Sequence, residues 1–357
     1  MNRTQFHKNF KLQKKSFKSS KELIDFSKKI SKEVAIFLQQ WFNDSLFIEV
    51  NTSGSTGKPK VIQLQKKYMI NSALATGNYF NLPKNTTALL CMSPNFIAGK
   101  MMLVRALTLG WHIDVVEPTL NPLKNSKKQY DFSAMVPLQL NNSIEDIHKI
   151  KTIIVGGGAV SNELIARIQN IETAIFTTYG MTETITHIAV KKLNHCNSNF
   201  VEEYNYRVLP NVSISKDSRS CLVIKASKVS NEVVVTNDLV ELVSSTEFKW
   251  LGRFDTVVNS GGIKLIPEQI EKKLAKIILQ RFFVTGIPDN LLGKKLILVI
   301  EGENTLGKDT FLSKVRNLQS LTKYEIPKEI YLIGKFVETE TRKINRKQTL
   351  KSLKNIY

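Results

Sequence analysis

The chain has 357 residues, of which 42% are hydrophobic and 23% are charged, and its formal net charge is +20. This composition is typical of a soluble globular protein with two or more domains. The first residues contain no continuous apolar region and no apolar run approaches membrane-spanning length, so we expect no signal peptide, no membrane span and a cytoplasmic location. Three widely separated cysteines and five histidines without metal-ligand spacing argue against a disulfide framework and a zinc site.

The excess of lysine and arginine raises the question of a nucleic-acid partner. These residues are dispersed, with modest enrichment near each end, and no zinc finger or aromatic RNA-binding motif accompanies them. The alternative explanation of the positive charge is a generally lysine-rich composition together with anionic small-molecule substrates. We therefore expect no specific nucleic-acid partner, although the charge alone would allow nonspecific binding at low salt.

The first half of the chain alternates between helical and strand-like patterns. Helices are predicted over 20–42, 67–80 and 99–110, and strands over 87–94, 112–118 and 173–184. Residues 47–64 are predicted to form a strand, a loop and a second strand. Residues 151–169 are predicted to form a strand, a glycine turn and a helix. Units of this kind build parallel sheets, and ligands bind where polar residues follow such strands.

The second half is antiparallel in character and then changes. The predicted elements are strands over 221–227, 232–243 and 248–262, a helix over 267–279, strands over 282–287 and 296–302, and a helix over 309–319. A shift in composition near "GRFD" suggests a domain boundary. We therefore predict an α/β fold in which a large core of mixed sheets and helices, residues 1–252, is followed by a small α+β domain, residues 253–357.

Residues 51–60, "NTSGSTGKPK", form a glycine-rich stretch that ends in lysine. The common nucleotide P-loop requires four residues between its glycines, whereas only two separate Gly54 from Gly57. Pro59 also disfavours a helix at this point because proline lacks an N–H group. The stretch alone therefore fits a solvated turn or a hydroxyl-rich phosphate loop.

Five motifs in a fixed order resemble those of the adenylate-forming superfamily of acyl-CoA synthetases and related ligases. They are "TSGSTGKPK", "TYGMTET", "TNDL", "LGRFDTVVNSGGIKLIPEQIE" and "TETRKINR". The resemblance implies two half-reactions: a carboxylate attacks the α-phosphorus of ATP to give acyl-AMP and pyrophosphate, and a thiol such as that of CoA then attacks the activated carbonyl. Positioning and charge neutralisation, with Mg²⁺, would supply most of the catalysis.

The resemblance assigns the phosphates of ATP to two of these motifs. The residues expected around the β and γ phosphates are Thr52, Ser53, Gly54, Ser55, Thr56, Gly57 and Lys60. Thr182 and Glu183 would contact phosphate and hold Mg²⁺, for which a carboxylate is a suitable ligand.

The nucleoside of ATP is assigned to the middle of the chain. Tyr179 would stack on adenine, and Asp238 would accept hydrogen bonds from the ribose hydroxyls, with Arg253 donating to the same region. Glycines that would let the adenine approach the backbone are Gly156, Gly157 and Gly158. A core tyrosine and a turn-capping aspartate are the alternatives for Tyr179 and Asp238.

The end of the chain would serve both half-reactions. The resemblance implies that Lys343 bridges the substrate carboxylate, the ribose and the α-phosphate during adenylation, although Arg342 stands where the family has glycine. Asp255 matches the family hinge about which the small domain rotates. Gly261 and Gly262 would then face the pantetheine arm of CoA. A solvated lysine and a plain hairpin turn are the alternatives for Lys343 and for the two glycines.

The substrate acid is harder to assign. Only about fifty residues precede the phosphate loop, and such short forms look like the o-succinylbenzoate–CoA ligases of menaquinone biosynthesis. Arg105 occupies a position similar to an arginine of those ligases and suits a second carboxylate. Phe96 stands where they carry histidine, and Lys100 could add charge or lie on a helix surface. Transfer to a carrier-protein thiol and nucleic-acid binding are the alternative functions; the oligomeric state is left open.

Overall fold

The computed structural model describes residues 6–51, 61–195, 205–302, 308–339 and 344–353. Within them, the largest element is a twelve-stranded mixed sheet. Its strands, in spatial order, are β1 (Lys11–Leu12), β5 (His112–Val115), β4 (Thr87–Leu90), β6 (Tyr130–Met135), β7 (Ile150–Val155), β8 (Ala174–Gly180), β9 (His187–Lys192), β10 (Tyr206–Val208), β14 (Glu247–Arg253), β13 (Val234–Leu242), β12 (Cys221–Lys225) and β11 (Ser213–Lys216). Neighbours are parallel from β1 to β8 and antiparallel from β8 onward.

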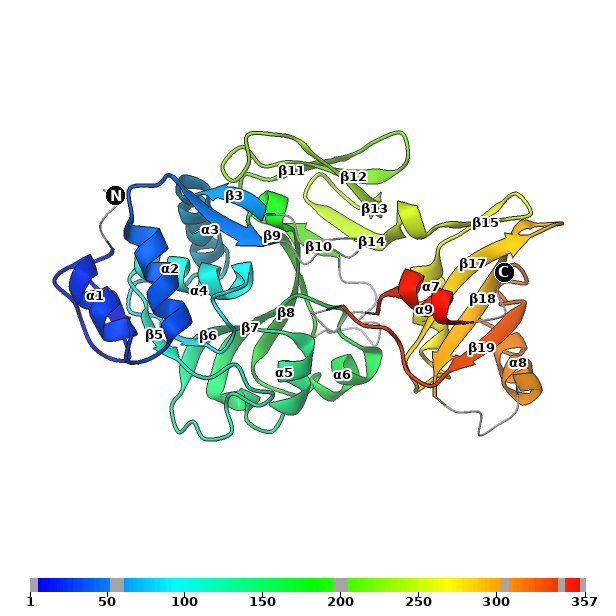
Figure 1. Ribbon diagram of the computed structural model, residues 1–357, viewed down its shortest axis with the longest axis horizontal. Coiled ribbons are helices and arrows are strands. Elements are labelled where there is room, and N and C mark those ends of the chain that lie inside the picture. The colour runs from blue at the N-terminus through cyan, green and yellow to red at the C-terminus, as the bar shows by residue number, and fades with distance from the viewer. Residues whose placement is uncertain (1–5, 52–60, 196–204, 303–307, 340–343, 354–357) are drawn as a thin grey trace.

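Helices cover the parallel part of this sheet (Figure 1). They are α1 (Ser20–Ser27), α2 (Lys32–Phe42), α3 (Lys66–Tyr79), α4 (Ile97–Leu109), α5 (Pro137–Asn142) and α6 (Asn162–Arg167). The prediction of one helix over 20–42 is wrong, because the chain breaks between α1 and α2. Ser31 begins the second helix: its side chain accepts a hydrogen bond from the backbone N–H of Val34 at 3.3 Å, as serine does at a helix N-terminus.

Strands β2 (Phe47–Asn51) and β3 (Val61–Gln65) form the antiparallel pair predicted on either side of the phosphate loop. Their last register pair is Asn51 with Val61, so the residues between them connect two paired strand ends. Among the described residues, no helix is both long enough and apolar enough to cross a membrane.

The C-terminal part has its own strands and helices, which Figure 1 shows beside the large sheet. These are β15 (Val258–Ser260), β16 (Ile263–Leu265), α7 (Pro267–Leu274), β17 (Phe282–Asp289), β18 (Gly293–Glu301), α8 (Lys308–Arg316), β19 (Glu329–Ile333) and α9 (Arg346–Ser352). The predicted strand over 248–262 is therefore two strands, β14 and β15, separated by a short 3₁₀ turn at Phe254–Thr256. Strands β17, β18 and β19 form a separate sheet with its own hydrophobic clusters. The predicted α/β fold with a small α+β part is confirmed.

Close packing joins this part to β14. Gly252 lies so near α7 that an added Cβ would be 2.5 Å from Cγ2 of Ile266 and 2.6 Å from Oε2 of Glu268. The side chain of Thr256 donates a hydrogen bond to Oε1 of Glu268 at 2.9 Å. With φ +156°, this position favours glycine where β14 meets the small part. A division at residue 252 into two bodies that move relative to each other stays a prediction.

Candidate functional site

The candidate site lies where the large sheet changes from parallel to antiparallel, at the ends of β7 and β8. Ligands of open α/β sheets bind at such carboxyl ends of strands. Gly156 follows β7 directly, and an added Cβ there would lie 2.7 Å from Oγ1 of Thr178 on β8. Gly157 has φ +81°, a conformation that favours glycine. Gly158 is exposed beside it. The structure therefore provides exposed backbone here, as the adenine assignment needs.

A tight turn connects β8 to β9 and presents Glu183 at the surface. Gly180 pairs with His187 across this turn, and a Cβ on Gly180 would lie 2.2 Å from the carbonyl oxygen of Thr186. Ile185 has φ +68°, which is strained for a β-branched residue, at a cost of about 1–3 kcal/mol. Its side chain is buried, which helps hold the turn in this conformation.

Glu183 is the residue predicted to hold magnesium, and its role stays a prediction. The residue is exposed in the 3₁₀ turn at Thr182–Thr184, next to half-buried Thr182. The described residues contain no group of three or more histidine, cysteine or acidic side chains that could hold a metal by themselves. Mg²⁺ commonly keeps several waters and is bound by one or two carboxylates together with substrate phosphates, so one exposed glutamate at the predicted phosphate site would suit it.

The carboxylate of Asp238 receives a hydrogen bond on each of its oxygens. The hydroxyl of Tyr179 donates to Oδ2 at 2.6 Å, and the indole N–H of Trp250 donates to Oδ1 at 3.1 Å. Asp238 is buried within β13, so the turn-capping alternative is wrong. Burial and the neighbouring negative charge of Asp238 raise the pKa of Tyr179, which therefore remains a hydrogen-bond donor.

Arg253 connects the predicted ribose site to the predicted hinge. It faces Asp238 in the β13–β14 register, with 3.9 Å between Nη1 and Oδ1 of Asp238. It also donates two hydrogen bonds to Asp255, from Nε to Oδ1 at 2.9 Å and from Nη2 to Oδ2 at 3.1 Å. These bonds lower the pKa of Asp255. The structure therefore brings Tyr179, Asp238, Arg253 and Asp255 together in one polar network.

Gly261 and Gly262 form the two-residue turn between β15 and β16. Their φ angles are +55° and +81°, as in the hairpin turns that favour glycine. Both are exposed, and an added Cβ on Gly262 would meet nothing within 4 Å. The hairpin alternative thus explains both glycines in this conformation. Contact with CoA stays a prediction.

Arg105 is a buried cation on α4 with few polar contacts. Its side chain is 1% exposed, and its one hydrogen-bond contact among the described residues is from Nη1 to the sulfur of Met102 at 3.7 Å. Nε and Nη2 have no partner among those residues. Burial lowers the pKa of Arg105 to about 9. A buried charge without a counter-ion is costly, so this guanidinium is suited to receive an anion.

His187, at the start of β9, lies within the electrostatic reach of Arg105 and was missed by the motif analysis. Burial, with the charge of Arg105 as a second cause, lowers the pKa of His187 well below its ordinary value. Its Nε2 is 3.5 Å from Oγ1 of Thr76 on α3. The positive charge of Arg105 therefore favours a neutral imidazole at His187. Its position three residues after the "TYGMTET" motif was the available signal.

Lys100 is not on the helix surface, so that interpretation is wrong. Its side chain is buried, and Nζ donates to the carbonyl oxygen of Pro94 at 2.8 Å and lies 5.5 Å from the ring centroid of Phe37. Burial lowers the pKa of Lys100. Phe96, which stands in place of the family histidine, is 57% exposed at the start of α4.

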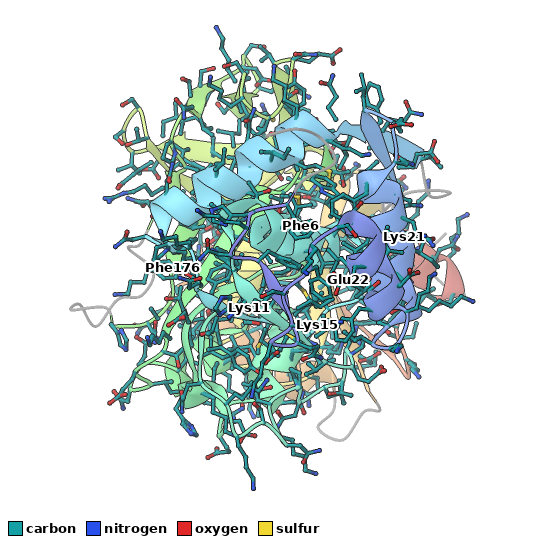
Figure 2. All side chains as sticks on the ribbon, turned by 90° about the vertical axis from the view of Figure 1, so that its left-hand side faces the viewer. Phe6, Lys11, Lys15, Lys21, Glu22 and Phe176 are labelled. Atoms are coloured by element: carbon teal, nitrogen blue, oxygen red, sulfur yellow. The ribbon has the colours of Figure 1, made fainter. Side chains whose placement is uncertain are left out.

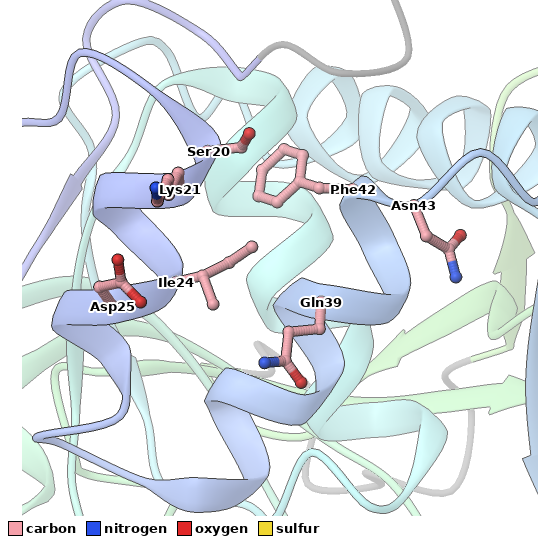
Figure 3. Close-up of a pocket in the computed structure, with 7 residues that line it drawn as sticks. All are labelled: Ser20, Lys21, Ile24, Asp25, Gln39, Phe42 and Asn43. Atoms are coloured by element: carbon pink, nitrogen blue, oxygen red, sulfur yellow. The ribbon is translucent and has the colours of Figure 1, made fainter.

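The predicted phosphate loop and the C-terminal lysine lie outside the described residues. The residues concerned are Thr52, Ser53, Gly54, Ser55, Thr56, Gly57, Lys60 and Lys343. A surface hollow of about 300 Å³ between α1 and α2, which includes Ile24 and Phe42, contains none of the predicted site residues (Figure 3).

Comparison with known proteins gives the same family for most of the chain. The family model described as AMP-binding enzyme matches residues 7–214. A 2-succinylbenzoate–CoA ligase of Staphylococcus aureus strain MSSA476 is 23% identical over an alignment of 322 residues that covers 83% of this chain and 65% of that protein. The chain thus spans about two thirds of the length of the curated relatives it matches.

Solved structures show the same fold. An acyl-CoA synthetase (AMP-forming)/AMP-acid ligase II-like protein from Dyadobacter fermentans DSM 18053 is 35% identical, with a TM-score of 0.59 over 90% of this chain and 96% of that one. The o-succinylbenzoate coenzyme A synthetase of Bacillus subtilis, in complex with ATP and magnesium ion, is 18% identical, with a TM-score of 0.73 over 88% of this chain and 74% of that one. The match of the family model and of the 35% identical relative shows that the chain belongs to the AMP-binding enzyme family.

Proposed function

We propose that this protein uses ATP to activate a carboxylic acid as acyl-AMP and then transfers the acyl group to CoA, and that the acid carries a second carboxylate, as 2-succinylbenzoate does. The observation that carries the proposal is the buried guanidinium of Arg105, two of whose nitrogens have no partner among the described residues. The relative named 2-succinylbenzoate–CoA ligase supports the same substrate class.

In the first half-reaction, the residues of this chain would hold ATP and screen its charge. Asp238 would receive the ribose hydroxyls, since its carboxylate is fixed by Tyr179, and Arg253 would lie beside it. Bound Mg²⁺ would neutralise phosphate charge next to Glu183. Lys343 would stabilise the charge that develops at the α-phosphorus.

The second carboxylate of the acid would pair with Arg105. Arginine presents two parallel N–H groups that match a carboxylate, and because this guanidinium is already removed from water, an anion would offset the cost of its burial. His187 would add a neutral hydrogen-bonding group to the same buried site. An acid with one carboxylate would leave the guanidinium unpaired.

The test is a product assay with ATP, Mg²⁺, CoA and a panel of acids that includes 2-succinylbenzoate and benzoate. We expect 2-succinylbenzoyl-CoA as the dominant thioester by mass spectrometry. Arg105→Ala should raise the KM for 2-succinylbenzoate far more than the KM for any monocarboxylate that the enzyme accepts. An equal rise for both would remove Arg105 from the acid site. Pyrophosphate release without a thioester would point instead to a carrier-protein thiol as the acceptor.

A further inference from the structure

Trp250 reaches the nucleotide site through an irregularity in the sheet. In the β13–β14 ladder, Leu239 pairs with Gly252, but the next residue, Val240, pairs with Trp250. Leu251 is therefore an extra residue, a β-bulge. Because side chains alternate between the two faces of a strand, this bulge turns Trp250 to the face that also carries Asp238.

The contact made on that face is specific. The indole N–H of Trp250 donates to Oδ1 of Asp238 at 3.1 Å, while Tyr179 donates to Oδ2. Asp238 is 8% exposed, so water competes little for these oxygens. With one donor on each oxygen, rotation of the carboxylate is restricted. Each oxygen still has capacity for a further hydrogen bond.

We propose that Trp250 is a positioning residue for the nucleotide: its N–H group fixes the carboxylate of Asp238 in the orientation that receives the ribose hydroxyls of ATP. This inference rests on the proposed function, because it needs Asp238 to bind ribose. A merely structural tryptophan would fill space beside the sheet, and its N–H group would be dispensable.

The experiment compares two nucleotides that differ only in the hydroxyls concerned. Dissociation constants for AMP and for 2′,3′-dideoxy-AMP are measured by titration calorimetry on the wild-type chain and on Trp250→Phe. We expect the substitution to weaken AMP binding about 5- to 10-fold, in line with the loss of one hydrogen bond to a charged group, and to leave dideoxy-AMP binding unchanged. In an Asp238→Asn background, Trp250→Phe should cause little further loss.

Trp111→Phe is the matched control, because the indole nitrogen of Trp111 has no partner among the described residues. It should change neither dissociation constant. Trp250→Met, which also lacks the donor, serves as a second variant if Trp250→Phe does not fold.

An equal loss for both nucleotides, or unchanged AMP binding by the variant, would overturn the role of Trp250 and leave the proposed function standing. A wild-type chain that does not bind AMP would contradict the proposed function and the inference together.

Discussion

Two buried ionisable residues of the site differ in how their charge is compensated. Asp238 receives hydrogen bonds on both oxygens from Tyr179 and Trp250. Arg105 has two nitrogens without a partner among the described residues. A compensated carboxylate is positioned before its ligand arrives, whereas an uncompensated guanidinium costs stability until an anion binds. Under the proposed function, the nucleotide site would therefore be positioned in advance, and the acid site would be destabilised until an anion fills it.

Arg105→Met should make the protein more stable and less active. Methionine fills a similar volume without the desolvated charge, so we expect a gain of about 1–4 kcal/mol in the free energy of unfolding. Thermal denaturation measures this gain, and 2-succinylbenzoate should raise the melting temperature of the wild type only. The surface variant Arg167→Met is the control and should not change the melting temperature. A lower melting temperature for Arg105→Met would show that the charge is already compensated.

His187 should make stability depend on pH. Its pKa is lowered in the folded chain, so below the ordinary value of 6.5 the unfolded chain binds a proton that the folded chain does not. Stability contributed by the neutral imidazole is therefore present above about pH 6.5 and is lost as the pH falls, by up to about 1.4 kcal/mol per unit. His187→Gln should reduce this loss in denaturant titrations between pH 7.5 and 5. The exposed His148→Gln should not.

The contacts of single residues were less predictable than their identities. The motifs named Tyr179 and Asp238, but the hydrogen bond between them depends on bringing β8 and β13 together across the sheet. Trp250 could not be found from the sequence because a regular strand pairing would place it on the opposite face. Burial of Arg105 was partly visible, since its helix is apolar over most of its length.

At the scale of the structural elements, the turn between β8 and β9 combines a strained backbone with a close approach of two chain segments. The positive φ of Ile185 and the close approach at Gly180 both occur within it. Strain of this kind persists where the surrounding structure fixes the backbone, and it is common at functional sites. The turn thus holds Glu183 in one place rather than on a freely moving loop.

Gly180→Ala should disturb this turn. The new Cβ would lie 2.2 Å from the carbonyl oxygen of Thr186, and because a backbone atom is involved the strands must shift. We expect a loss of about 1–3 kcal/mol in the free energy of unfolding, with slower pyrophosphate release that extra Mg²⁺ only partly restores. Gly334→Ala is the control, because its added Cβ would meet nothing within 4 Å. Unchanged stability of Gly180→Ala would show that the turn adapts.

The elements with clear periodicity were predicted, and the less regular ones were missed. Strand β6 was missed because Asp131 interrupts its apolar pattern. In the structure, Oδ2 of Asp131 accepts hydrogen bonds from both the backbone N–H and the hydroxyl of Thr87 on β4, so the strand tolerates the charge. The break between α1 and α2 was missed because both helices continue one apolar pattern. Ser31 was the signal for it.

On the scale of the whole molecule, the two parts of the chain meet through β14 and α7. Polar contacts add to the hydrophobic clusters that hold the small part together. Arg346 on α9 donates to Oε2 of Glu271 on α7 at 2.9 Å.

Several lysines lie at the N-terminal end of the molecule, as Figure 2 shows, and one of them, Lys15, pairs with Glu22 at 3.4 Å. We expect this positive charge to allow nonspecific binding of nucleic acid at low salt, which binding experiments at varied salt measure.

Variants of the small part should separate the two half-reactions. Lys343→Ala should slow acyl-AMP formation and spare thioester formation from preformed acyl-AMP, because the lysine is proposed to act only in the adenylating conformation. Gly262→Leu should do the opposite, with pyrophosphate release in a single turnover retained and CoA transfer blocked. Rapid-quench assays of acyl-AMP formation and of thioester formation measure the effect of each variant on each step. Equal losses in the two steps for either variant would contradict a rotation between half-reactions.

The pairing of β1 with β5 has a consequence for how the chain folds. Lys11 lies beside His112 at the edge of the large sheet, so the first strand finds its neighbour only after α1 to α4 and three intervening strands have been synthesised. Pairings between residues this distant in sequence form slowly, because a long loop must close first. During synthesis on the ribosome, we therefore expect the N-terminal segment to remain accessible to chaperones and proteases until β5 has emerged.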